Sequence, residues 1–133
     1  MGVQVYWYDD AKTVVCVKLD EGWTWTILYE RNEDVIQMMR TTDRPVHLVI
    51  DYSSAPTLPM EGVITHARNL LGAHPANCDL RLIITNSMLV LRLVSIFQKT
   101  FRTNLGKQVF AVRSAEAAAA LIRAREEAQR QSA

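Results

Sequence analysis

Three short apolar runs, each followed by a helical pattern, constrain the fold of this chain more than any other feature. Residues 46–51 (VHLVID), 80–85 (LRLIIT) and 108–112 (QVFAV) are largely apolar and show no regular alternation with polar residues. Strands that are buried on both faces have this pattern, and helices between them supply the crossovers of a parallel sheet. The runs therefore predict an α/β domain built from repeated strand-helix units.

The segment before these runs predicts a hairpin and a helix. Residues 3–8 (VQVYWY) and 13–19 (TVVCVKL) are rich in β-branched and aromatic residues, and the polar sequence DDAK separates them. Apolar residues then recur at three- and four-residue steps as far as Met39, and Thr24 is placed to cap the first turn of a helix. Pro45 disfavours helix just before it, so this helix should end near Arg40.

Three more helices complete the predicted fold. They run from about Met60 to His74, from Ser87 to about Phe101 and from Ser114 to about Gln129, and residues 126–133 are expected to form a polar, solvated tail. A chain of 133 residues has the usual size of one domain. The prediction is a single α/β domain with one mixed five-stranded sheet, an N-terminal β-hairpin followed by β-α-β-α-β-α, and four helices.

Composition narrows the classes of partner and cofactor. Fifteen Lys and Arg against 14 Asp and Glu give a net charge of +1, which argues against a nucleic-acid partner. Cys16 and Cys78 have no CxxC spacing, so we expect reduced, buried thiols. No stretch approaches about 18 uncharged apolar residues, and the start of the chain lacks an apolar run. We therefore expect no membrane span and a cytoplasmic location.

The sequence contains no catalytic motif. No glycine lies between Gly22 and Gly62, where a phosphate-binding loop would need several, and no serine has the GxSxG context of a hydrolase nucleophile. His47 lies in a predicted buried strand, His66 and His74 are expected at the surface, and none has metal-ligand spacing. We therefore expect a protein without enzymatic activity, cofactor or metal.

The helix predicted from Ser87 carries more apolar residues than one buried face requires. On a helical wheel an apolar arc of roughly 160° is predicted to be core, opposite a basic stripe. The arc contains Leu89, Val90, Leu93, Val94, Ile96, Phe97 and Phe101, and the stripe contains Arg92, Ser95, Lys99 and Arg102. Met88 and Leu91 fall beside the basic stripe, where they are either part of a docking surface or covered by a neighbouring loop.

Aromatic residues gather near the hairpin. Alternation places Tyr6 and Tyr8 on one face of the first strand and Trp7 on the other. An outward pair of aromatic rings would suit a protein interface, and packing beneath the first and last helices is the alternative. If the first strand is a sheet edge, pairing with a second copy would form a homodimer.

Polar residues follow the three parallel strands. Ligands of open α/β sheets bind where the carboxyl ends of the strands meet helix N-termini. The residues expected there are Asp51, Thr85, Asn86, Ser87 and Arg113. They could hold a small phosphorylated or carboxylated ligand, or they could serve only as helix caps and loop contacts.

The order of elements and three local sequences resemble the STAS domain, the family of anti-sigma-factor antagonists and of the cytoplasmic domains of sulphate transporters. HLVIDYSSAP resembles the family's central strand with its polar loop, LRLIITNSMLVLRLV the next strand and helix, and QVFAVRSAEAAAALI the closing strand and helix. The likeness covers residues 3 to about 125. It implies the mixed five-stranded fold and a signalling role through protein-protein interaction.

One family motif is absent. Bacterial antagonists of the STAS family are phosphorylated on a serine within Asp-Ser-Ser/Thr-Gly, at the start of the helix after the central strand. The corresponding residues here are Leu58-Pro59-Met60-Glu61-Gly62, without that serine or aspartate. The resemblance therefore implies a binding surface at this position but no phosphorylation switch.

These observations give one leading hypothesis and one alternative. The leading hypothesis is a STAS-like regulatory or scaffolding domain that binds a protein partner, or a second copy of itself, at the start of the second helix and on the third. The expected contact residues are Ser53, Ser54, Thr57, Met60, Met88 and Leu91. The alternative, prompted by the apolar excess of the third helix, is a carrier of a small molecule or lipid in an apolar pocket between that helix and the sheet.

Overall fold

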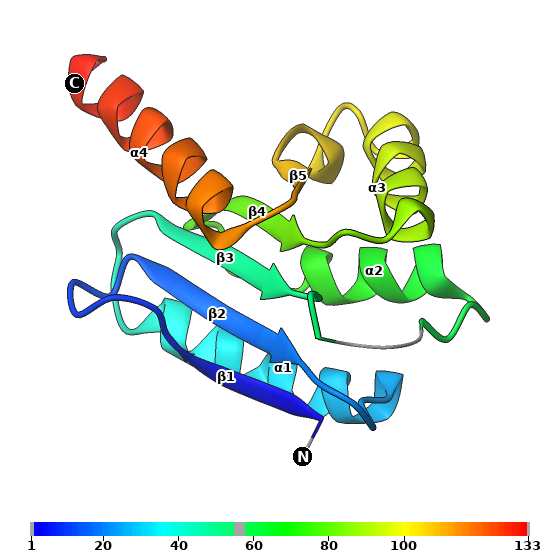
Figure 1. Ribbon diagram of the computed structural model, residues 1–133. Helices are drawn as coiled ribbons and strands as arrows, with labels where there is room; N and C mark the ends of the chain where they lie inside the picture. Colours follow the sequence, from blue (N-terminus) through cyan, green and yellow to red (C-terminus); the bar gives the residue numbers. More distant parts are fainter. Residues whose placement is uncertain (1, 55–57, 133) are drawn as a thin grey trace.

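The computed structural model describes residues 2–54 and 58–132, which form one mixed sheet with helices on both faces (Figure 1). The strands are β1 (Val3–Trp7), β2 (Val14–Leu19), β3 (Val46–Asp51), β4 (Cys78–Ile84) and β5 (Val109–Val112). The helices are α1 (Trp25–Arg40), α2 (Val63–Gly72), α3 (Met88–Thr100) and α4 (Ala115–Gln131), with a short 3₁₀ turn at Leu105–Lys107. The predicted fold class is confirmed.

The strands lie in the sheet in the order in which they occur in the chain. β1 pairs antiparallel with β2, and β2, β3, β4 and β5 then pair in parallel. Because crossovers between parallel strands are right-handed, successive crossovers that advance in one direction place their helices on the same face. α1, α2 and α3 share one face, and α4 lies alone on the other (Figure 1).

Each face has its own core. Met39 of α1 and Phe97 of α3 pack with Leu48 on the face that carries three helices. Ala118 and Ile122 of α4 pack on the opposite face. The small side chains of the alanine run at residues 117–120 let α4 approach the strands closely, as Figure 1 shows near β4.

Helix caps set three of the four helix starts near their predicted positions. The side-chain oxygens of Thr24, Ser87 and Ser114 accept hydrogen bonds from the backbone N–H three residues on. α2 begins at Val63, later than the predicted Met60, because Gly62 adopts a left-handed conformation with φ of 66°. Glycine takes this conformation without steric cost.

One expectation about a helix surface is wrong. Leu89 and Ile96 of the predicted core arc are 45% and 50% exposed, because α3 lies over the edge strand β5 and buries only a narrow stripe. α4 extends to Gln131, two residues beyond the expected end near Gln129, and most of its residues from Glu127 onward are exposed. Within α4, Arg125 and Gln129 donate hydrogen bonds to the buried carboxylate of Asp79, which anchors this end of the helix.

An irregularity in the pairing of β3 with β4 explains how His47 is accommodated. The register shifts between Val46 and Leu48, and the N–H of Leu80 donates to His47 Nδ1 at 3.2 Å. Burial lowers the pKa of His47. The expectation that His47 lies in a buried strand is confirmed.

Two further sequence expectations can be compared with the structure. Cys16 and Cys78 are free and buried, as expected. Across residues 2–54 and 58–132, no helix combines the length and the hydropathy that crossing a membrane requires.

Candidate functional site

An apolar cavity of about 140 Å³ lies between the sheet and helices α1, α2 and α3. The strands contribute its floor, and the three helices contribute its walls. Its lining includes Val17, Leu48, Ile50 and Ile83 from the sheet, Leu28 from α1, Ala67 and Leu71 from α2, and Leu93, Val94 and Phe97 from α3. The space therefore lies inside the larger core of the domain.

The size of the cavity is suited to a small ligand. Protein interiors are normally packed as densely as organic crystals, and an apolar cavity of about 150 Å³ is large enough to hold benzene. An apolar molecule of this size would gain binding free energy by covering the apolar side chains that line the space.

An aromatic cluster lines one region of the cavity. The rings of Trp23 and Trp25 meet edge to face at 4.9 Å, and Trp23 and Tyr52 do so at 6.0 Å. Trp25 is held from two sides, since its ring stacks on His66 at 4.7 Å and its Nε1–H donates to the carbonyl of Pro59 at 3.2 Å. These contacts fix the aromatic wall.

His66 is held in turn by a polar contact from α1. The Tyr29 hydroxyl lies 2.8 Å from His66 Nδ1, and it also accepts a bond from Asn69 Nδ2 at 3.4 Å. His66 is half-buried. The expectation of a solvated His66 is therefore wrong, because α2 packs its imidazole against Trp25.

Asn32 and His74 form the polar region of the cavity wall. Trp25, Leu28 and Asn32 occupy positions i, i+3 and i+7 of α1, so they share one face and Asn32 lies about 10 Å along the axis from Trp25. The Oδ1 atom of Asn32 lies 2.9 Å from His74 Nε2. Burial, with a smaller effect of the Arg81 charge, lowers the pKa of His74 to about 3.

This burial of His74 corrects the expectation of a surface histidine. The sequence His74-Pro75 is typical of an exposed turn. In the structure, however, the His74 ring contacts α1 at the buried side chain of Asn32. No Lys, Arg, Asp or Glu belongs to the cavity wall within the described residues. The cavity therefore favours ligands without charge.

The polar residues predicted at the strand ends form a polar rim, which consists of Asp51, Thr85, Asn86, Ser87 and Arg113. The side-chain hydrogen bonds of this rim are made to neighbouring residues of the chain. Asp51 pairs with Ile84 in the sheet, and the N–H of Thr85 donates to the carbonyl of Val112, so the three strand ends are adjacent. Asp51 Oδ1 accepts bonds from the N–H and hydroxyl of Ser53.

Of the remaining rim residues, two make local hydrogen bonds and two are exposed. Thr85 is buried and accepts a bond from the N–H of Ser87, which itself caps α3. Asn86 and Arg113 are exposed. The hydrogen bonds of Asp51 are those of a loop contact, and the hydrogen bond of the Ser87 side chain is that of a helix cap.

The predicted contact residues are distributed as follows. Ser53, Ser54, Met60 and Met88 are exposed, and Leu91 is half-buried. Thr57 lies outside the described residues.

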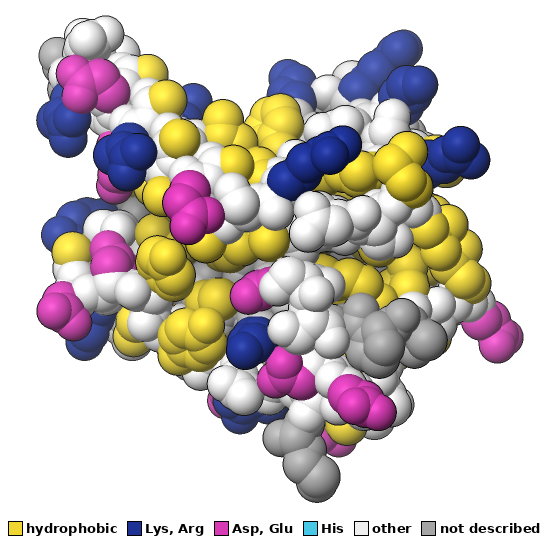
Figure 2. All heavy atoms as spheres, viewed as in Figure 1, with side chains coloured by type: hydrophobic (Ala, Val, Ile, Leu, Met, Phe, Trp, Pro, Cys, Tyr) yellow, Lys and Arg dark blue, Asp and Glu magenta, His cyan; other side chains and the backbone are white. Residues whose placement is uncertain are grey.

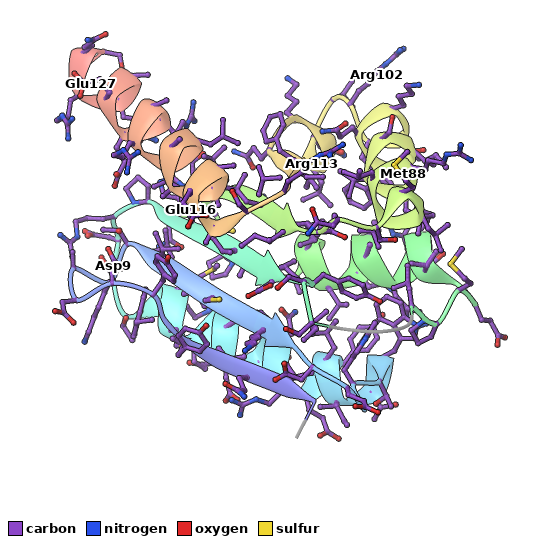
Figure 3. The ribbon with its side chains drawn as sticks, viewed as in Figure 1. Asp9, Met88, Arg102, Arg113, Glu116 and Glu127 are labelled. Carbon is purple, nitrogen blue, oxygen red and sulfur yellow. The ribbon has the colours of Figure 1, made fainter. Side chains whose placement is uncertain are left out.

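The surface over α3 is basic and partly apolar. No acidic residue occurs from residue 80 to residue 115, a segment that contains Arg81, Arg92, Lys99, Arg102, Lys107 and Arg113. All of these except Arg81 are exposed. Figure 2 shows Lys and Arg side chains over the region of α3, and Figure 3 shows Met88 and Arg102 near opposite ends of this helix.

Sequence reasoning anticipated a pocket beside the third helix but missed two of its walls. The helical spacing of Trp25, Leu28 and Asn32 is a usable signal, because it points a polar amide toward a core face. The position of His74 has no such signal, since it depends on contacts with a residue 42 positions away.

In comparisons with known proteins, no family model, curated protein or solved structure matches the chain.

Proposed function

We propose that this domain binds and carries a small apolar molecule in the cavity between the sheet and helices α1, α2 and α3. The observation that carries the proposal is the apolar cavity itself, which is lined by side chains of all three helices. The residues that line this space are almost all apolar, and such a surface favours the binding of an apolar molecule that covers it.

The fold is compatible with a STAS-like domain, and we keep that affiliation as part of the proposal. Its support is the hairpin, the following helix and three strand-helix units in the order that the resemblance requires. A fold alone does not define a function. The ligand role therefore rests on the cavity and not on the affiliation.

Native mass spectrometry and calorimetry test the ligand role. The protein purified from its own cells should retain a small molecule, and the purified chain should bind toluene or indole with a rise in melting temperature. In a matched pair, Ala67→Leu should fill the cavity and abolish binding, whereas Ala120→Leu on the exposed side of α4 should not. Absence of both a retained molecule and any binding would rule out the carrier role.

A second function is favoured by a separate observation on the surface. Met88, Leu89 and Ile96 are 64%, 45% and 50% exposed on α3, and the helix also carries the exposed cations Arg92 and Lys99. Apolar side chains framed by cations suit a protein partner with an acidic, partly apolar surface. The domain would then act as a regulatory or scaffolding module through α3.

Charge reversal tests this second function. Arg92→Glu combined with Lys99→Glu should weaken binding to an acidic partner and remove its salt dependence, and Arg123→Glu on α4 is the control. Sedimentation at several concentrations tests the homodimer, because the edge strand β1 could pair with a second copy. A partner whose affinity is indifferent to both the reversal and salt would contradict the α3 surface.

A further inference from the structure

The two edges of the sheet are protected to different degrees. At one edge, β5 has four residues, and the carbonyl of Val109 accepts a hydrogen bond from Gln98 Nε2 at 2.7 Å. The carbonyls of Gln108 and Val112 accept bonds from the β4 side. Because successive residues of a strand alternate, the Val109 carbonyl points away from the sheet. A side chain of α3 therefore covers part of this edge.

β1, at the other edge, has no such protection among the described residues. It pairs with β2 without a register shift, and no described strand lies on its outer side (Figure 1). The carbonyl of Gly2 and the N–H of Tyr8 bond toward the β2 side. By alternation, the backbone groups of Val3, Val5 and Trp7 point away from the sheet.

The outer side of β1 opens into a groove whose second wall is α1. The groove is lined by Val3, Gln4, Val5 and Tyr6 from the strand and by Ile27, Glu30 and Arg31 from the helix. The strand sequence, VQVYW, contains no proline and no charged residue, which are usual means of keeping an edge strand from pairing. Such an edge fits an extended strand, because a strand offers backbone donors and acceptors at matching intervals.

We infer that β1 pairs antiparallel with β1 of a second copy of this chain, with Val5 opposite Val5 of the other copy, so that the two sheets become one. In this register Val3 lies opposite Trp7 of the other copy, and the whole of β1 is paired. No like charges meet along the strands, because β1 has none. The inference does not depend on the carrier function, and it gives the homodimer a defined interface.

The charges of the groove favour a second copy over another chain. A two-fold axis at Val5 places the two α1 helices on the same face of the joined sheet, one on each side of the axis. Each groove wall carries the carboxylate of Glu30 and the guanidinium of Arg31, so each copy offers charges of both signs to the other. Glu30 forms no ion pair within the described residues. An acidic or a basic peptide would match only one of the two charges.

Sedimentation of two variants at the same position tests the strand interface. The wild-type protein should dimerise, and Val5→Pro should raise the dimer dissociation constant about tenfold or more, because it removes the outward N–H of Val5 from both copies. Val5→Ala keeps this N–H and should change the constant by less than about threefold. Circular dichroism checks that both variants fold. A wild-type protein that stays monomeric up to about 200 μM, or a folded Val5→Pro variant that dimerises as the wild type does, would overturn the inference.

A charge exchange on α1 tests the identity of the partner and leaves β1 unchanged. Glu30→Arg gives the groove wall two cations, and Arg31→Glu gives it two carboxylates. Each variant alone should dimerise about fivefold more weakly than the wild type, whereas an equimolar mixture should regain the wild-type constant by forming heterodimers. Wild-type dimerisation of either variant alone would exclude α1 from the interface and overturn the inference. Toluene binding to the same variants, which keep the cavity wall intact, reports on the carrier function separately.

Discussion

The two faces of the sheet bury their strands in different ways. Helices α1, α2 and α3 cover one face and surround a cavity of about 140 Å³, whereas α4 covers the other and leaves a smaller space of about 50 Å³ beside Ala118. Large side chains such as Trp25 and Phe97 line the cavity on the first face, whereas Ala118 and Ile122 of α4 pack on the second. The number of helices on a face therefore does not decide how densely it packs.

Removal of Asp79 should produce the largest effect, on the α4 face. The buried carboxylate accepts two bonds from Arg125, at 2.9 and 3.1 Å, and one from Gln129 at 2.8 Å. Asp79→Ala should lower the free energy of unfolding by about 3 kcal/mol in urea denaturation. Asp34→Ala, which breaks an exposed pair with Arg31, should cost less than about 0.5 kcal/mol. Equal costs for the two variants would contradict an anchoring role for Asp79.

The second largest predicted effect is a loss of folding stability at acidic pH, caused by His74 on the face that carries the cavity. The pKa of folded His74 is lowered to about 3, so the unfolded chain, with a histidine pKa near 6.5, binds this proton first as the pH falls. Stability is complete above pH 6.5 and declines below it, by about 2 kcal/mol between pH 7 and pH 5 from this residue alone.

Urea denaturation across that pH range measures the effect of His74. The variant His74→Gln, which keeps a polar side chain beside Asn32, should lose most of the slope. Some slope should remain, since the pKa of His47 is lowered as well. An unchanged slope in the variant would show that His74 is not responsible.

A matched pair of alanine substitutions tests the difference in packing directly. Ala118→Leu should destabilise the protein by about 1 to 2 kcal/mol, because the larger side chain exceeds the small space of about 50 Å³ between α4 and the sheet. Ala67→Leu should be neutral or stabilising by up to about 1 kcal/mol, because its side chain extends into the cavity. Thermal unfolding monitored by circular dichroism measures both. Similar losses from both variants would mean that the two faces are equally dense.

The smallest predicted effect concerns the start of α4. The hydroxyl of Ser114 accepts a bond from the N–H of Ala117 at 3.1 Å, so Ser114→Ala should cost about 1 kcal/mol. The hydroxyl of Ser132, at the other end of the helix, donates to the carbonyl of Gln129, and Ser132→Ala should change stability by less than about 0.5 kcal/mol. Equal costs for the two would leave the cap without a stabilising role.

Local patterns were enough to predict the sheet and most of its helices. Runs such as 46–51 and 80–85 have a composition that suits strands buried on both faces, and Thr24, Ser87 and Ser114 mark helix starts by their own side-chain chemistry. These signals act over a few residues, so they can be read without knowledge of the tertiary structure.

The candidate site depends on contacts that no local pattern contains. A helical wheel gives the direction of Leu89 and Ile96, but it does not show that α3 lies at the sheet edge, where both remain exposed. His74 contacts Asn32, which lies on α1 and is 42 positions away in the chain. The sequence could therefore predict an apolar pocket between the third helix and the sheet, but not that Asn32 and His74 belong to its lining.

The order of the strands has a consequence for how the chain folds during synthesis. Every neighbour in the sheet is also the neighbouring strand in the chain, so each strand-helix unit can dock on the unit made just before it. The carboxylate of Asp79 is synthesised 46 residues before Arg125, its ion-pair partner. We therefore expect the nascent domain to assemble progressively from its N-terminus and to gain its last stabilising contacts only when α4 leaves the ribosome.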